Sequence, residues 1–418
     1  MTREIGFQTD GLWGWGDIAL DVAESNPQLR WPQSIRVFDQ MRGEESQVSS
    51  VLAAVTLPVR SIGWHIDPGN ARPEVVDLIS RDLGIPQRGH TLARPTRTRG
   101  RFSWSEHIRL ALLELVYGHS FFEQVVDIGE DGLAHLAKLA WRPPRTISRI
   151  NVARDGGLLS IEQAVGARTA KIPVNRLVAY VNDREGANWL GRSLLRAPYK
   201  NWLLKDRLLR AQSLTVERNG LGMPVYKGAE PPSSASADDR AKWDEAQIKS
   251  GLDITRNFRA GEAAGASIPH SASLDLIGVS GKLPDTEGPI RYHDEQMARS
   301  VLAHFLNLGT ETGSWALGST FADFFAQSLN AVAAQIADVA NQHIIEDLVD
   351  MNWGPSEPAP VLVVDEIGKE HPATAEAIRA LAESGVLTAD DELEAHVREI
   401  YGLPSMDPTT ARMKEATQ

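Results

Sequence analysis

Residues 192–218 combine a long helical pattern with basic residues on one face, and this segment constrains the fold most. At about 100° per residue, six cations fall in one stripe about 80° wide: Arg192, Arg196, Lys200, Arg207, Arg210 and Arg218. The opposite side is mainly apolar, with Lys205 and Asp206 as exceptions. Seven Lys/Arg and two Asp/Glu give 192–218 a net charge of +5, whereas the whole chain carries −12. This segregation of charge predicts an anionic neighbour.

Local signals set the limits of this basic helix. Pro198 has no backbone N–H, so the regular helix should begin there, with 193–197 as a separate turn. Asn219 and Gly220 supply a left-handed stop at the other end. A basic amphipathic helix is equally often an ordinary solvated surface helix, so this pattern alone does not decide a function.

The composition is that of a globular protein with two or three structural units: 418 residues, 42% hydrophobic and 23% charged. The chain has no Cys, which excludes disulfides, Cys-zinc sites and a thiol nucleophile. The sequence shows neither a signal-peptide core nor a run of about 18 apolar residues. We therefore expect an intracellularly assembled protein without a membrane span.

The region 34–190 is predicted to be a mixed α+β unit. Helices are expected at 34–42 and 44–57, the second ending before Pro58. A strong helix at 104–117 should be followed by a hairpin, and short strands should continue over 145–181. The hairpin pairs 121–129 with 133–141 across a turn at Asp131 and Gly132.

The second half of the chain is predicted to be mainly helical. Three Gly residues in 309–319 indicate a flexible loop between two helices. The expected helices are 238–256, 289–308, 320–350 and an acidic pair at 373–384 and 389–401, with two short strands in 265–283, a strand at 361–367 and a flexible tail from 404.

Catalytic motifs are absent from the sequence, which contains no GxxxxGKS/T, HExxH or GxSxG pattern. His119 and Glu123 could meet in space, but their segment has a strand pattern, and ordinary polar packing is expected over a metal site. We therefore expect no catalytic residues, no metal and no cofactor.

Several segments in order resemble the portal proteins of tailed bacteriophages, particularly the Mu-type portal family. They are VFDQMRGEESQVSSVLAAVTLPVRSIGWHID (37–67), HIRLALLELVYGHSFFEQV (107–125), GRSLLRAPYKNWLLKDRLLRAQSLTVERNGLGMPV (191–225) and LNLGTETGSWALG (306–318). The resemblance covers about residues 37–404, ending with the acidic helix pair.

The resemblance implies a homo-oligomeric ring, usually of twelve subunits, at one vertex of the capsid. Double-stranded DNA would pass through its channel without sequence specificity during packaging and ejection. The implied partners are the terminase large subunit, the major capsid protein and the head–tail adaptor. The protein would reside in the virion after assembly in the host cytoplasm.

The resemblance also implies an α+β portal fold with a wing, a two-helix stem, a short clip and a helical C-terminal crown. The expected parts are an N-terminal arm (1–36), the wing (37–192), a stem helix (193–218), the clip (219–237), a returning stem helix (238–258), a wing and tunnel helix (259–308), a tunnel loop (309–318), a long helix with the crown (319–404) and a flexible tail (405–418).

Two sets of site residues follow. The tunnel loop would face DNA with Thr310, Glu311, Thr312, Gly313, Ser314 and Trp315. The basic stripe of 192–218 has three possible orientations. It could line the channel, face outward, or pair with acidic residues of a neighbouring subunit, such as Asp238, Asp239, Asp244 and Glu245.

Two other classes of protein remain as alternatives. A DNA-binding regulator could use the basic helix 193–218, although the acidic C-terminal helix pair counts against it. An enzyme with an unrecognised site is disfavoured by the missing motifs. Oligomer size separates the portal from both alternatives.

Overall fold

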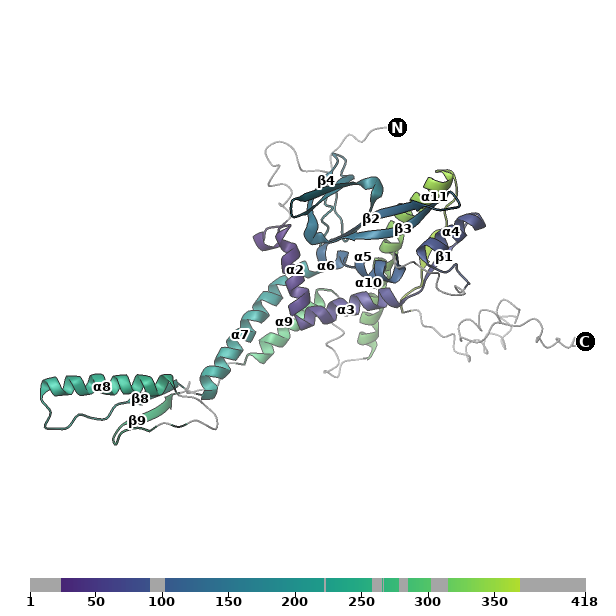
Figure 1. Ribbon diagram of the computed structural model, residues 1–418. Helices are drawn as coiled ribbons and strands as arrows, with labels where there is room; N and C mark the ends of the chain where they lie inside the picture. The colour runs from purple at the N-terminus through teal and green to yellow at the C-terminus, as the bar shows by residue number, and fades with distance from the viewer. Residues whose placement is uncertain are drawn as a thin grey trace, which may run out of the picture. The chain divides into compact units, whose positions relative to one another are not determined.

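The computed structural model describes residues 24–90, 102–221, 223–257, 265, 267–277, 285–301 and 315–368. Within these ranges the chain has mixed α/β structure, as expected (Figure 1). Contacts divide it into Met1–Val364 and Asp365–Gln418. The helix pair expected at 373–401 and the tail lie outside the described residues.

The first described elements belong to the core rather than to a separate arm. A 3₁₀ turn, η1 (Pro27–Leu29), precedes helices α2 (Gln33–Glu44) and α3 (Ser46–Ser61). Leu29 and Ile35 are only 5% and 2% exposed, so the expected arm 1–36 ends in packed structure.

The helix α3 continues to Ser61 instead of ending before Pro58. Val55 and Val59 on its inner face are buried. We attribute the difference to this packing, which offsets the hydrogen bond that a proline cannot make.

Helices α5 (Trp104–Ala111) and α6 (Glu114–Tyr117) lead into the first three-stranded sheet. Gly118, with φ of +87°, turns the chain from α6 into β2 (His119–Ile128). β3 (Ala134–Arg142) pairs antiparallel with β2, which confirms the predicted hairpin, and β7 (Leu177–Val181) pairs with its other edge.

A second antiparallel sheet has the order β4-β5-β6. Its strands are β4 (Ile147–Val152), β5 (Leu158–Val165) and β6 (Arg168–Pro173), flanked by the 3₁₀ turns η2 (Pro144–Thr146) and η3 (Val174–Arg176). This confirms the short strands expected over 145–181. One face of the sheet packs onto the first sheet through a buried cluster: Phe121, Ile147, Leu158, Ile161, Ile172, Leu177 and Val181.

A two-stranded sheet joins distant parts of the chain. β1 (Trp64–Asp67) pairs antiparallel with β10 (Val361–Val364), and helix α4 (Pro73–Leu83) follows β1. The side chain of Asn341 holds β10 from the other side. Its Nδ2 donates to the Leu362 carbonyl at 3.2 Å, and its Oδ1 accepts from the Leu362 N–H at 2.8 Å.

The long helix expected at 320–350 consists of three parts. Helix α10 (Trp315–Ala340) is followed by a π-helical turn, η6 (Asn341–Ile345), and by α11 (Glu346–Trp353). Residues 315–318, expected in the loop, are therefore helical. Ala316 and Leu317 favour a helix there, although Gly318 does not, and 302–314 lie outside the described residues.

Helix α7 (Tyr199–Leu221) is the basic helix, preceded by the 3₁₀ turn η4 (Leu194–Arg196). This confirms the break at Pro198, but α7 continues through Asn219 and Gly220, where a stop was expected. Helix α9 (Glu287–Arg299) packs against α7 (Figure 1).

The expected return of 238–258 alongside the basic helix is not what the structure has. Helix α8 (Ala237–Arg256) forms, but it packs against β8 (Met223–Lys227), which pairs with β9 (Ser273–Ile277). Gly251 of α8 lies against the Tyr226 ring, where an added Cβ would be 2.3 Å from the ring. Gln247 Oε1 accepts hydrogen bonds from Tyr226 Oη at 2.8 Å and from Ala229 N at 3.2 Å.

Candidate functional site

The basic helix is anchored by a buried ion triad. Lys205 of α7 is 6% exposed, and its Nζ donates to Glu45 Oε1 and to Asp294 Oδ1, each at 2.6 Å. Burial alone would lower the pKa of Lys205, but hydrogen bonds to Asp294 and Glu45 raise it above its usual value. The cation at an apolar helix position is thus explained, since it joins α7 to α9 and to the start of α3.

Three cations of the predicted stripe are held by carboxylates of the same chain. Arg192 Nη1 lies 3.3 Å from Asp183 Oδ2. Arg196 forms a bidentate pair with Glu24, in which Nη2 donates to Oε1 at 2.9 Å. Arg210 Nε donates to Asp206 at 2.8 Å, one helical turn back.

The stripe leaves two cations available. Lys200 and Arg207 are exposed and form no ion pair among the residues that the structure describes. They lie seven residues apart, so they share one face of α7 about 10 Å apart along its axis. The Arg218 side chain and the tunnel-loop residues Thr310 to Ser314 lie outside the described residues.

Exposed unpaired ammonium and guanidinium groups can bind phosphates as point charges, without reading bases. The acidic residues proposed as their alternative partners are exposed as well. Asp238, Asp239, Asp244 and Glu245 occupy the first half of α8, and Ser236 Oγ caps this helix by accepting from Asp239 N at 3.3 Å. The exposure of both sets of side chains is therefore compatible with ion pairs between the basic stripe and α8 of a neighbouring subunit.

A buried polar cluster lies between α5, α6 and the first sheet. His107 Nε2 and Tyr180 Oη are 2.8 Å apart, and both residues are fully enclosed. Burial lowers the pKa of His107 to about 3 and raises that of Glu114 to about 8. Glu114 is 0% exposed, so a dissolved substrate does not reach this carboxyl in the fold described.

His119 and Glu123, considered above as a meeting pair, have separate partners. His119 Nδ1 lies 3.0 Å from the Leu190 carbonyl, and Glu123 pairs with Arg142. Across the described ranges, no cluster of three His, Asp or Glu side chains is suited to hold a metal.

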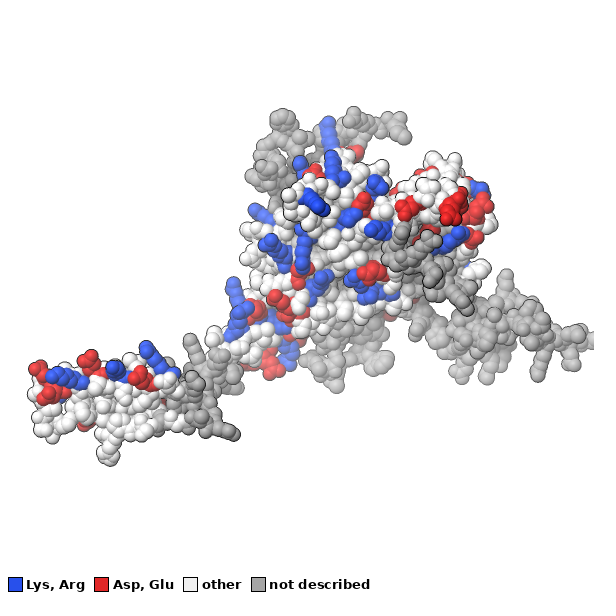
Figure 2. All heavy atoms as spheres, in the orientation of Figure 1, with Lys and Arg blue, Asp and Glu red and all other residues white. Residues whose placement is uncertain are grey.

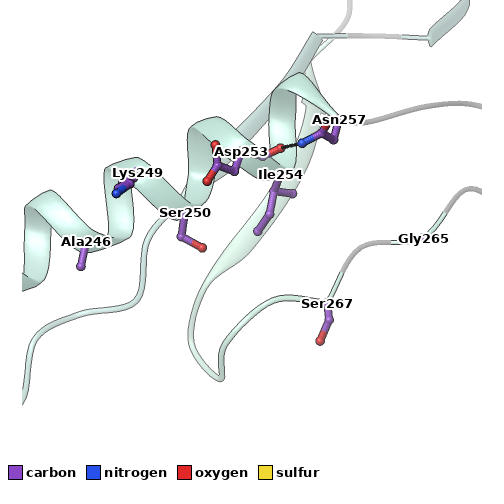
Figure 3. Close-up of a pocket in the computed structure, with 8 residues that line it drawn as sticks. All are labelled: Ala246, Lys249, Ser250, Asp253, Ile254, Asn257, Gly265 and Ser267. Atoms are coloured by element: carbon purple, nitrogen blue, oxygen red, sulfur yellow. Dashed lines mark hydrogen bonds between the residues drawn. The ribbon is translucent and has the colours of Figure 1, made fainter.

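An open hollow runs along α8, a feature that sequence periodicity could not predict. Its volume is about 610 Å³, and Figure 3 shows Ser250 and Ile254 extending from α8 on one side, with Ser267 on the facing segment. Lys249, Ser250 and Asp253 are exposed, so this is a surface hollow rather than an enclosed site.

The family described as the portal protein of Mu bacteriophage matches residues 35–403. The chain belongs to this portal family. Portal proteins are a structural, non-enzymatic class of proteins. No helix in the described part of this portal chain is long and apolar enough to span a membrane.

Solved structures of gene transfer agent (GTA) particles share the fold of this portal chain. A chain of the native GTA virion has a TM-score of 0.53 at 12% identity, covering 90% of this chain and 95% of that one. A chain from the neck of the native GTA particle, computed with C12 symmetry, has a TM-score of 0.53 at 11% identity, and the match covers 88% of this chain and 93% of that one. A chain from the neck of the empty particle, computed with C6 symmetry, has a TM-score of 0.51 at 14% identity, with the same two coverages.

Proposed function

We propose that this portal protein forms a ring of twelve copies at one capsid vertex, through which double-stranded DNA is packaged and ejected. The observation that carries the proposal is the family match over 35–403. The C12 symmetry of the native GTA neck supports the ring size. The ring would dock the terminase large subunit during packaging and the head–tail adaptor afterwards, and would contact the major capsid protein.

We assign the portal parts to the elements as follows. The wing comprises the two three-stranded sheets with the helices α2 to α6. The stem is α7 with α9, because these helices pack together and share the Lys205–Asp294 pair. The clip is the local unit of β8, α8 and β9, and 302–314 would supply the tunnel loop.

The DNA contact within the channel is assigned to Lys200 and Arg207. Both are exposed cations on one face of α7, whereas Arg192, Arg196 and Arg210 are neutralised within the chain. A few screened charges repeated around a ring would bind phosphates weakly enough for DNA to slide.

The experiment that tests the proposal is the mass of the purified protein in solution, with negative-stain images of the same sample. A ring of about twelve copies with a central hole is expected. A stable dimer that retards DNA would contradict the ring and favour the DNA-binding regulator instead.

A further inference from the structure

A second basic surface lies on the sheet β4-β5-β6, away from α7 in sequence. Residues 145–176 contain six Lys/Arg and two Asp/Glu, a net charge of +4 in a chain of −12. In Figure 2, Lys and Arg side chains gather over the region where Figure 1 places β4, with few acidic side chains among them. This local reversal of sign calls for an anionic partner.

The strand register places Arg149 and Lys171 on the outer face of the sheet. Arg149 is opposite Glu162, and Glu162 is opposite Lys171, so the three side chains form one row across the sheet. The next register pair, Ile161 and Ile172, belongs to the buried cluster on the other face. The basic row therefore points away from the core.

Three cations define what we call the sheet patch: Arg149, Lys171 and Arg176. All three are exposed, and none forms an ion pair among the described residues. Neighbouring Arg145 differs, because its Nε lies 2.5 Å from Asp39 Oδ2. The single acid in the row, Glu162, accepts a hydrogen bond from Asn151 Nδ2 at 3.0 Å.

The spacing of the patch suits a duplex. Strands lie about 4.8 Å apart, so Arg149 and Lys171 are about 10 Å apart across the sheet. Arg168 is not part of this surface, because it has the strand parity of Ile172 and so lies on the other face of β6. Duplex DNA carries one negative charge per about 1.7 Å of its axis, so several phosphates lie within reach of such a patch.

Cations on edge strands can also serve to block edge-to-edge pairing of sheets. Arg149 and Lys171 lie on the two edge strands β4 and β6, so they can serve this role as well. Arg176 lies in η3, outside the strands, so edge protection does not account for the whole patch.

We propose that the sheet patch binds the phosphate backbone of duplex DNA, independently of base sequence, as a DNA-contacting surface separate from α7. The choice of ligand rests on the proposed function, since DNA is the polyanion that a portal conducts. The binding itself needs no ring. It is a property of one face of one subunit.

The test compares two charge-matched variants of the full chain for binding to a labelled duplex. The patch variant replaces Arg149, Lys171 and Arg176 with Gln. The control variant replaces three exposed cations elsewhere with Gln: Arg60, Arg81 and Lys138. Fluorescence anisotropy is measured with two unrelated sequences at several salt concentrations, and circular dichroism verifies that each variant is folded.

We expect the patch variant to bind at least about tenfold more weakly, with a salt slope shallower by about two to three units, and the control to bind like wild type. Equal binding by the two variants would overturn the proposal. Unchanged DNA binding combined with loss of the patch variant from assembled particles would also overturn it, because the patch would then dock an acidic protein. Solution mass on the same samples tests the ring independently.

Discussion

Lys205 Nζ and Asp294 Oδ1 lie 2.6 Å apart across the contact between α7 and α9, in a place where both side chains are largely shielded from water. Glu45 approaches the same ammonium group at 2.6 Å from the N-terminal cap of α3. One cation thus fixes three helices that come from widely separated parts of the sequence. The stem assigned above begins at this junction.

Replacing Lys205 with Met should destabilise the protein by about 3–5 kcal/mol, because Glu45 and Asp294 would stay buried without a counter-charge. Urea denaturation measures the change. Arg210→Met, which breaks a solvent-exposed pair on the same helix, should cost far less, because water screens that pair. Adding Glu45→Gln and Asp294→Asn to Lys205→Met should restore part of the loss, and equal costs for Lys205 and Arg210 would refute the role of the triad.

The pairing of α7 with α9 predicts a specific cross-link. Asn201 Oδ1 and His293 Nδ1 are 3.0 Å apart, and the chain has no Cys of its own. The double variant Asn201→Cys/His293→Cys should therefore react with a short bis-maleimide to give an internal link, visible by peptide mass spectrometry. Asn201→Cys/Ile248→Cys is the control on α8. Preferential linkage of the control pair would reverse our stem assignment.

Gly191 should tolerate no side chain. Its φ is +62°, and an added Cβ would lie 2.2 Å from the Gly118 carbonyl oxygen. Gly132 has a similar φ of +77° but nothing within 4 Å. Gly132→Ala should cost about 1 kcal/mol for the backbone conformation alone. Gly191→Ala should cost several times more, since two backbone segments must separate, and thermal melts that show equal shifts would contradict this reading.

The buried carboxyl of Glu114 predicts a stability that falls with rising pH. Burial raises its pKa from 4.5 to about 8, so between these values the native state keeps a proton that the unfolded chain has lost. The contribution is complete below about pH 4.5 and lost by about pH 8, on the order of 5 kcal/mol in all.

Glu114→Gln should remove this pH dependence, because the amide is neutral at every pH. Denaturation of both proteins between about pH 5 and about pH 8 measures the difference. The buried His107 and His119, whose pKa values are lowered to about 3 and about 4, are common to both proteins and cancel in the comparison. Parallel curves for the two proteins would show that Glu114 does not titrate as proposed.

Reversing the charge of Lys200 and Arg207 together should reduce the number of DNA-filled particles while leaving rings intact. Both side chains are exposed and unpaired within the described residues, so the variant should fold normally. Particle DNA content and negative-stain images measure the two effects separately. Arg81→Glu/Lys138→Glu is the control with the same charge change. Loss of the rings themselves would place the stripe against an acidic neighbour such as Asp238.

The sequence predicts those elements whose signals are local. The prediction of a hairpin around Asp131 and Gly132 was correct, because the alternation of apolar and polar residues and the turn residues both indicate it. The expectation that 238–258 returns alongside the basic helix was wrong, because helical periodicity does not identify the element that packs against a helix face. The contact of Gly251 with Tyr226, which holds α8 on β8, depends on a fit that spacing does not reveal.

The candidate site was predictable to a similar extent. Spacing placed the cations of 192–218 on one helix, but their neutralisation depends on side chains that a helical wheel does not contain. Glu24 reaches Arg196 from far along the chain, and Asp183 reaches Arg192 across a turn. The position of Lys205 among apolar residues was the one local sign of a buried partner.

Asn341 adds a consequence of another kind. Its side-chain amide gives the Leu362 backbone one donor and one acceptor. These are the two hydrogen bonds that a residue of an adjacent strand would make. The register of β10 is thereby fixed from the helix rather than from the connection that leads into it. Residues 354–360 can then change in length during evolution, and the strand they deliver will still lock into the same position against Trp64.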